Sequence, residues 1–312
     1  MAIYTALQSF GLVLLLWNCR SILSNLSEFQ HYVHKNNPHI ICLCETWLKF
    51  TDTFKLKGYN IYRKDRLERG GGLAILIKDT IQSYHDPNYC SHYDGKLESL
   101  VITIQFNNSS SDVCLLYNPC QTILADEFNY YFNSLSNNSL ILGDFNAHHT
   151  LWDSRLFNMQ VNNTGKSLLD SYSTNTNFNL LTPNALGTFY DVKTNKDSTI
   201  DLVFGSGILN TADSFKDNLM GSDHYPIFYC FYPKATEYNT TSPLSWQMKK
   251  INWAVWSDAL SSGFQNGLTY SLSYISDKIL ETTRTYTNPI SKKHCQNILN
   301  LSGVQNVADL LL

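Results

Sequence analysis

Short apolar runs that end in polar residues restrict most strongly how this 312-residue chain can fold. LVLLLW ends at Asn18, IICLC at Glu45 and LILG at Asp144. Uninterrupted apolar runs of this length are typical of strands that are covered on both faces. Between the first two runs, the apolar residues of 22–36 recur at helical spacing. This alternation predicts an α/β fold.

The same patterns predict two layers of strands, each covered by helices, over residues 12–232. The expected strands are 11–17, 39–45, 70–78, 97–106, 112–119, 139–143, 178–182, 198–206 and 222–232, and the expected helices are 22–36, 122–136 and 164–177. Residues 1–11 are expected to be a leader, and 233–312 a linker and helical tail. No apolar run is long enough to cross a bilayer, so no membrane partner is expected.

The charge balance and the cysteines limit the functional class. The net charge is −3, so the field of the whole molecule does not attract DNA or a membrane. The densest basic stretch, 63–69, also contains acidic residues and is expected to be a solvated loop. No C-x-x-C pair occurs, and Cys42, Cys44, Cys114 and Cys230 lie in apolar runs. We expect buried free thiols in an intracellular protein, nuclear, cytoplasmic or both.

Polar side chains lie at or near the ends of six apolar runs. They are Asn18, Glu45, Tyr117 with Asn118, Asp144 with Asn146, Asp201, and Asp223 with His224. Any one of them alone would be an ordinary cap or turn residue. Because sites on α/β sheets form beyond the strand ends, we expect all six places to converge. Their oxygen atoms suit Mg²⁺ or Mn²⁺, and Asp and His side chains can activate water and stabilise phosphoryl oxygens. The set predicts phosphodiester hydrolysis.

The stretch ILGDFNAHHTLWDS (141–154) could also suggest a calcium loop or a zinc site. A calcium loop that starts at Asp144 needs Gly at its sixth position and Glu at its twelfth, where this chain has His149 and Arg155. Zinc is disfavoured because the side chains of His148 and His149 diverge and no H-E-x-x-H or cysteine partner is present. The absence of G-x-S-x-G argues against a Ser-His-Asp hydrolase.

Seven blocks in order along the chain resemble those of the endonuclease/exonuclease/phosphatase superfamily. They are WNCRS (17–21), ETW (45–47), RGGGLAILIK (69–78), LYNP (116–119), ILGDFNAHHTLW (141–152), STIDLVF (198–204) and SDHYPI (222–227). Within the superfamily they look like the endonuclease domain of non-LTR (LINE-type, jockey-like) retrotransposons. The resemblance implies a DNase I-like, four-layer α/β sandwich with two packed mixed β-sheets flanked by helices.

By this resemblance, the metal side of the site contains three residues. Glu45 is the principal Mg²⁺ ligand, Asn18 helps to organise the metal and the phosphate, and Asp223 completes the acidic cluster. Tyr117 contacts the phosphate or the leaving group. Arg20 stands where some members carry a second metal-binding Asp, and this departure is usual in the retrotransposon branch.

The resemblance assigns the hydrolytic step to four further residues. Asp144 orients or activates the water, and Asn146 binds the scissile phosphate. Asp201 orients His224, which stabilises the pentacovalent phosphate. Thr199 is expected to support Asp201 by a hydrogen bond.

The adjacent residues His148 and His149 are expected to have different roles. His149 fits the G-D-x-N-x-x-H form of the motif as a supporting residue, whereas His148 is either an ordinary surface residue or a DNA contact. Target-sequence preference is expected to depend on surface loops and DNA shape rather than on the catalytic residues.

The implied activity is that of a Mg²⁺-dependent endonuclease that nicks double-stranded DNA and leaves a 3′-hydroxyl and a 5′-phosphate. In a full-length element this end would prime reverse transcription, with retroelement RNA and a reverse transcriptase as partners, and the chain is expected to stop before that enzyme. The alternatives are an abasic-site repair nuclease or a phosphatase of the same fold, and an inactive retroelement remnant.

Overall fold

The computed structural model describes residues 11–66, 70–86, 96–106, 109–232, 244–246, 253–262, 278 and 289–291. The chain divides into two compact units, Met1–Lys234 and Ala235–Leu312. In the second unit, β15 (Leu244–Trp246) pairs antiparallel with β16 (Pro289–Ser291), and α5 spans Trp253–Ser262. Among the described residues, no helix has the length and apolar character needed to cross a membrane.

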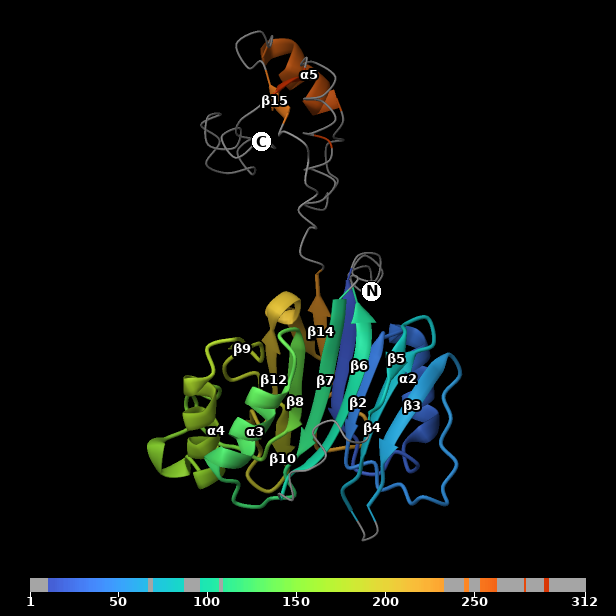
Figure 1. The fold of residues 1–312 in the computed structure, drawn as a ribbon, viewed down its shortest axis with the longest axis vertical. Helices are drawn as coiled ribbons and strands as arrows, with labels where there is room; N and C mark the ends of the chain where they lie inside the picture. Colours follow the sequence, from blue (N-terminus) through green and yellow to red (C-terminus); the bar gives the residue numbers. More distant parts are fainter. Residues whose placement is uncertain are drawn as a thin grey trace. The chain divides into compact units, whose positions relative to one another are not determined.

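Two six-stranded mixed sheets form the first unit (Figure 1). The first sheet has the order β13-β14-β1-β2-β4-β3, and the second has the order β5-β6-β7-β8-β12-β9. The first sheet contains β1 (Leu12–Asn18), β2 (Ile40–Cys44), β3 (Tyr59–Lys64), β4 (Leu73–Lys78), β13 (Asp213–Lys216) and β14 (Ile227–Phe231). The second contains β5 (Ser83–Tyr84), β6 (Glu98–Phe106), β7 (Ser109–Tyr117), β8 (Ser139–Asp144), β9 (Phe178–Leu180) and β12 (Asp201–Ser206). A separate hairpin pairs β10 (Phe189–Asp191) with β11 (Lys196–Ser198).

Alternate side chains of the buried strands fill two different layers. Leu14 and Leu16 of β1 lie in the core between the sheets, whereas Leu15 and Trp17 pack in the layer beneath α2 (Leu26–Asn36). Because both faces of β1 are covered, its sequence contains no polar residue before the strand end.

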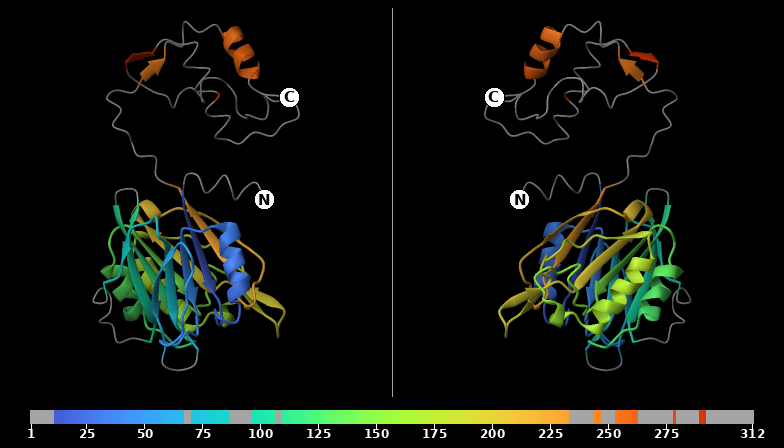
Figure 2. Two further views of the ribbon diagram at one scale, coloured as in Figure 1. Left: turned by 90° about the vertical axis from the view of Figure 1, so that its right-hand side faces the viewer. Right: turned by 90° about the vertical axis from the view of Figure 1, so that its left-hand side faces the viewer.

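Helices also cover the outer face of the second sheet (Figure 2). Phe128 of α3 (Ala125–Ser134) and Leu168 of α4 (Asn163–Thr174) belong to one buried cluster with Phe204 of β12. The order of layers is therefore helix, sheet, sheet, helix, which confirms the predicted four-layer α/β sandwich.

The edges of the sheets depart from the sequence prediction. The strands β3, β5, β10, β11 and β13 were not predicted, and none of their residues is fully buried. Without a continuous apolar run, the pattern does not separate such strands from loops. Arg63 and Lys64, expected in a solvated loop, belong to edge strand β3, where Arg63 pairs with Asp65. The helix predicted from residue 22 begins at Leu26, because 22–25 form a turn.

The cysteines of the described residues are free thiols. Cys42, Cys44, Cys114 and Cys230 are buried, as predicted. Burial raises the pKa of Cys230 to about 11. Cys120 is exposed and lies close to the site described next.

Candidate active site

Strand register brings three predicted residues of the second sheet into one row. Tyr117 of β7 is level with Asp144 of β8, and Asp144 is level with Asp201 of β12. Gly143 permits this close packing, because its φ is +145° and a Cβ there would lie 1.8 Å from the carbonyl oxygen of Leu116. The polar ends of three strands therefore meet at one end of the sheet.

The amide of Asn18 connects the two sheets. Asn18 Nδ2 donates hydrogen bonds to Glu45 Oε1 at 3.0 Å and to Asp144 Oδ2 at 2.9 Å. The hydroxyl of Tyr117 donates to Glu45 Oε1 at 3.0 Å. Burial and the carboxylate of Glu45 raise the pKa of Tyr117 well above its usual range, so the phenol stays a neutral donor. Glu45 and Asp144 thus belong to one network.

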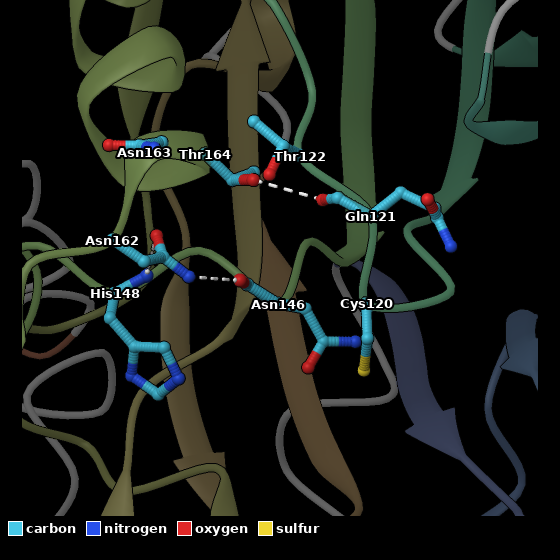
Figure 3. A pocket seen from close by; sticks show the side chains of 8 residues that line it. All are labelled: Cys120, Gln121, Thr122, Asn146, His148, Asn162, Asn163 and Thr164. Carbon is cyan, nitrogen blue, oxygen red and sulfur yellow. Dashed lines mark hydrogen bonds between the residues drawn. The ribbon is translucent and has the colours of Figure 1, made fainter.

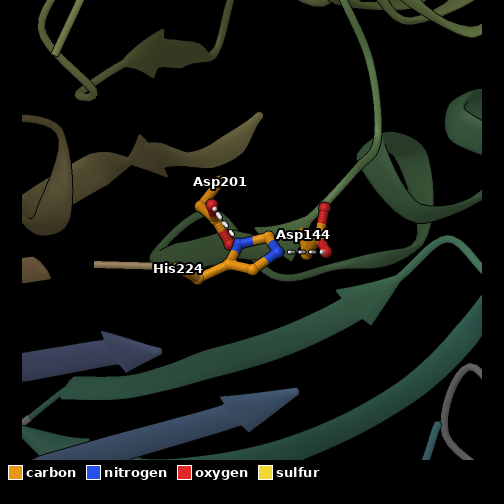
Figure 4. Close-up of side chains that lie close together, drawn as sticks. All are labelled: Asp144, Asp201 and His224. Carbon is orange, nitrogen blue, oxygen red and sulfur yellow. Dashed lines mark hydrogen bonds and ion pairs between the residues drawn. The ribbon is translucent and has the colours of Figure 1, made fainter. Parts of the chain in front are cut away.

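Asp144, Asp201 and His224 form a deeply buried cluster (Figure 4), and these residues are 1%, 1% and 5% exposed. His224 Nδ1 is 2.9 Å from Asp201 Oδ2, and Nε2 is 3.8 Å from Asp144 Oδ2. Burial opposes protonation of the imidazole, but the two carboxylates outweigh it and raise the pKa of His224 to about 9. The imidazole is therefore protonated at neutral pH and can donate from both nitrogens.

The same cluster contains an acid whose ionisation is disfavoured. Burial and the neighbouring Asp201 raise the pKa of Asp144, although His224 and Asn18 act in the opposite direction. One ligand atom from each of the three cluster residues lies within 4.8 Å of the others, so this group could hold a metal ion. Metal binding there would release the imidazole proton, and the raised pKa of His224 makes this release less favourable. Asp201 Oδ1 is buried and has no hydrogen-bond partner among the described residues.

The backbone of His224 is also held in place. Its N–H donates to Ser222 Oγ at 3.2 Å, and Ser222 Oγ donates to the carbonyl of Asn18 at 2.7 Å. Trp17 Nε1 donates to the His224 carbonyl at 3.1 Å. Ser222 lies within the SDHYPI block, but no local sequence pattern predicts this contact.

Glu45 is half-buried and lies in a loop that a glycine turn holds. Glu45 Oε2 accepts from Trp47 Nε1 at 3.2 Å, and the Trp47 N–H donates to the Gly71 carbonyl at 3.0 Å. Gly72 follows Gly71 in the same turn, and its N–H donates to Glu98 Oε2 at 2.7 Å. Glu98 therefore fixes the turn that positions Glu45. It was not predicted, and its only local signal is an acid at the start of a predicted apolar strand.

Asn146 occupies the turn after β8 with a φ of +46°. Its N–H donates to Asp144 Oδ1 at 3.0 Å, and its Nδ2 donates to the Asn118 carbonyl at 2.8 Å. A primary amide carries two N–H groups, so one of them remains for a substrate oxygen.

Thr199 does not support Asp201 as predicted. Among the described contacts, Thr199 Oγ1 accepts from the Gly187 N–H at 3.0 Å and from Arg155 at 3.3 Å, and none joins it to Asp201. Thr188 takes the expected place, because its Oγ1 accepts from the Asp201 N–H at 3.0 Å. The segment before β10 supplies this contact, and nothing in the local sequence around Asp201 indicates it.

Asp153 and Arg155 hold the loop after β8 against the start of β12, and neither was predicted. Asp153 Oδ1 accepts from Arg155 Nε at 2.7 Å, and Asp153 Oδ2 accepts from the Thr199 N–H at 2.9 Å. Burial raises the pKa of Asp153, but the hydrogen bonds from Arg155 and Thr199 outweigh it and leave the pKa below its ordinary value.

Asp223 and His149 lie at the margin of the site. The carboxylate of Asp223 forms an ion pair with Arg20, so its role as a metal ligand stays a prediction. His149 Nδ1 accepts from the Leu151 N–H at 3.0 Å, and its ring lies 5.2 Å from that of Trp152. These contacts of His149 all lie within its own turn.

Comparison with solved structures and with protein families gives this geometry a context. The profile described as Endonuclease/Exonuclease/phosphatase family matches residues 15–224. The endonuclease domain of TRAS1, a telomere-specific non-LTR retrotransposon, is similar over 72% of this chain and 99% of its own, with a TM-score of 0.56 and 15% identity. The AP endonuclease LMAP from Leishmania major is similar over 72% and 89%, with a TM-score of 0.56 and 16% identity.

Two Drosophila melanogaster proteins are similar in sequence. The probable RNA-directed DNA polymerase from transposon X-element is 26% identical over 143 residues, which are 45% of this chain and 15% of that protein. The probable RNA-directed DNA polymerase from transposon BS is 22% identical over 242 residues, 75% of this chain and 26% of that protein. The chain therefore matches about a quarter or less of the length of these relatives.

Proposed function

Because the chain belongs to the endonuclease/exonuclease/phosphatase family, we propose that it is a Mg²⁺-dependent endonuclease that nicks one strand of DNA. The nick leaves a 3′-hydroxyl and a 5′-phosphate. The observation that carries this proposal is the single network that joins Glu45, Asn18 and Tyr117 to the buried Asp144–Asp201–His224 cluster. The similarity to two transposon polymerases supports a role in which this 3′ end primes reverse transcription.

In the proposed reaction, each side chain has a separate role in the hydrolysis of one phosphodiester bond. Asp144 accepts a proton from the attacking water, whose oxygen bonds to phosphorus while the bond to O3′ breaks. His224, protonated and held by Asp201, donates to a non-bridging oxygen, where charge develops. The free N–H of Asn146 donates to the same phosphate. The hydroxyl of Tyr117 would turn from Glu45 to donate a hydrogen bond to the departing O3′, which takes its proton from solvent water.

The donor set around Glu45 fits a hard divalent cation. Its carboxylate is half-buried, and its described hydrogen bonds come only from N–H and O–H donors, so both oxygens carry lone pairs for a cation. The same amide that contacts Glu45 carries a neutral oxygen, Asn18 Oδ1, whose one described hydrogen bond comes from the Arg20 N–H at 3.3 Å. Glu45 and Asn18 would hold Mg²⁺, or Mn²⁺ in its place. The bound cation would neutralise charge on the phosphate and on the leaving oxygen.

Plasmid nicking tests the proposal. Purified protein should convert supercoiled plasmid to open circles with Mg²⁺ and not with EDTA, and a polymerase should extend the nicked ends directly. Asp144→Ala should abolish nicking, whereas His31→Ala, at an exposed site on α2, should not change it. The proposal fails if the wild type does not nick, or if Asp144→Ala nicks equally well. A strong preference for an abasic duplex would assign the chain to repair instead.

The cellular setting is part of the same proposal. We place the protein inside the cell, in the nucleus, the cytoplasm or both, with double-stranded DNA as substrate. Its partners would be a reverse transcriptase in the same longer polypeptide and the retroelement RNA. Fractionation of cells with an antibody to residues 12–232 would test the location.

A further inference from the structure

The side of the site that belongs to the second sheet carries little positive charge. A cavity of about 450 Å³ beside Asn146 has no lysine or arginine in its lining (Figure 3). Burial lowers the pKa of His148, which also lines the cavity, so its ring is mostly neutral at pH 7. Farther along the same loop, the guanidinium of Arg155 is engaged by Asp153 and Thr199. These residues therefore offer no free cationic group to a DNA phosphate.

Arg20 offers such a group on the side of the first sheet. It lies two residues after β1, with a φ of +44°, and Ser21 follows with a φ of +82°. Residues other than glycine rarely adopt this left-handed conformation. The Arg20 N–H donates to Asn18 Oδ1 at 3.3 Å, and the Ser21 N–H donates to the Glu45 carbonyl at 2.8 Å. The fold therefore maintains an unfavourable backbone conformation that places Arg20 directly beside two residues of the site.

The guanidinium of Arg20 is held in place but keeps free donors. Its one described side-chain bond is the ion pair with Asp223, and the two side chains are 53% and 22% exposed. The Asp223 carbonyl accepts from the Tyr190 N–H at 2.8 Å, so the backbone beneath this carboxylate is fixed. A guanidinium has five N–H donors and can bind a phosphate through two parallel hydrogen bonds. Arg20 thus presents an oriented, half-exposed phosphate-binding group at the margin of the site.

The same ion pair disfavours Asp223 as a ligand of the metal. A divalent cation on this carboxylate would lie close to the guanidinium, and the two positive charges would repel each other. Glu45, by contrast, accepts hydrogen bonds only from uncharged groups among its described partners. The carboxylate of Asp223 therefore suits the role of counter-ion to Arg20 better than that of a metal ligand.

We infer that Arg20 binds a phosphate of the DNA backbone next to the scissile phosphate, and that Asp223 is a positioning residue that holds its guanidinium. The inference rests on the proposed function, which makes DNA the substrate. It replaces the metal-binding role predicted for Asp223. It also assigns to Arg20 a contribution to DNA affinity that is separate from the hydrolytic work of the buried cluster.

The salt dependence of DNA binding tests the phosphate contact. Fluorescence anisotropy in EDTA gives the Kd of the full chain for a labelled, undamaged duplex over a range of salt concentrations. Arg20→Ala should raise Kd about fivefold or more at low salt and lower the slope of log Kd against log salt by about 0.9, the value for one phosphate. Arg20→Lys keeps the charge, so it should keep the slope and raise Kd less. Circular dichroism confirms that the variants are folded.

Lys35→Ala is the matched control for the loss of one positive charge. Lys35 is exposed in the last turn of α2, which leads to the start of β2, whereas Arg20 follows the end of β1. Because β1 and β2 are parallel, the two residues lie at opposite ends of this strand pair. Lys35→Ala should leave both Kd and slope unchanged. If Arg20→Ala behaves in the same way, the phosphate contact is refuted.

Calorimetric titration with Mn²⁺ tests the role of Asp223. Asp223→Asn should bind Mn²⁺ with a Kd within about twofold of the wild type, whereas Glu45→Gln should bind at least about tenfold more weakly. In the DNA-binding assay, Arg20→Ala should change log Kd at most half as much when Asp223 is already replaced by Asn. A tenfold loss of Mn²⁺ affinity in Asp223→Asn would make this residue a metal ligand. Additive effects of the two substitutions on DNA binding would refute its positioning role.

Neither measurement depends on nicking, so this inference and the proposed function can fail separately. A wild type that does not nick, but whose salt slope falls as expected in Arg20→Ala, would remove the proposed activity and uphold the phosphate contact. A wild type that nicks, with an unchanged slope in Arg20→Ala, would remove only the contact.

Discussion

The two halves of the site differ in how far they are closed to solvent. Asp144, Asp201 and His224 are at most 5% exposed, and the imidazole of His224 lies between the two carboxylates, whereas Glu45 is half-buried in a loop that a glycine turn holds. A buried, fixed set of charges needs no reorganisation when charge develops on a phosphate. A cation that keeps several waters needs an open side. We therefore expect the buried half to set the chemistry and the Glu45 half to set the response to metal.

Asp144→Asn tests the buried half and should have the largest effect. Loss of the proton acceptor should lower the nicking rate at saturating Mg²⁺ about 10²–10⁴-fold. Because burial and Asp201 raise the pKa of Asp144, its ionised form is disfavoured in the fold. The thermal unfolding midpoint should therefore stay unchanged or rise. Single-turnover nicking and circular dichroism measure the two quantities, and a lowered midpoint would contradict the assignment.

Glu45→Gln tests the open half through the metal. We expect the Mg²⁺ concentration at half-maximal rate to rise at least about tenfold. High Mg²⁺ should restore much of the rate, which it should not do for Asp144→Asn. Glu28→Gln on α2, an exposed exchange of the same kind, is the control. If Glu45→Gln titrates with Mg²⁺ like the wild type, the metal belongs instead to the buried cluster.

Glu98 should affect the same half indirectly and less strongly. Glu98→Ala removes the acceptor of the Gly72 N–H, so the turn beside Glu45 loses its anchor. The Mg²⁺ requirement should rise several-fold, up to about tenfold, with little change in kcat at saturation. Glu98→Gln keeps an acceptor oxygen and should restore most of the affinity. Equal defects in both variants would argue that the carboxylate charge matters rather than the turn.

The central strands of the fold could be predicted from sequence because burial on both faces leaves a continuous apolar run. The strands β1, β2, β4 and β8 all show one, and each lies within a residue or a few residues of its predicted position. Edge strands such as β3 and β13 carry no such pattern, since one side faces solvent.

The convergence of these strand-end side chains could be predicted from the sequence, but their contacts could not. Asn18 and Asp144 are 126 positions apart, and only the register of two sheets brings the amide to the carboxylate. Long-range hydrogen bonds of this kind leave no local signal, which is why Glu98 was missed and why Thr199 was given the contact that Thr188 makes. The type of a residue at a strand end suggests its chemistry, whereas its partners depend on the whole fold.

Asp153 connects the loops of the buried half without touching its cluster residues, and its replacement should change stability more than chemistry. Asp153→Asn should lower the free energy of unfolding at pH 7 by about 2 kcal/mol, the usual cost of losing hydrogen bonds to a charged group. The pKa of Asp153 lies below its ordinary value of 3.8 in the fold, so its contribution is present above that pH and is lost as the pH falls through the folded value. Urea unfolding should therefore show a smaller difference in stability between variant and wild type at pH 3 than at pH 7. The control Asp170→Asn, at an exposed position on α4, should not change the stability at either pH. A difference that stays constant with pH would mean that packing of Asp153, rather than its charge, holds the loops together.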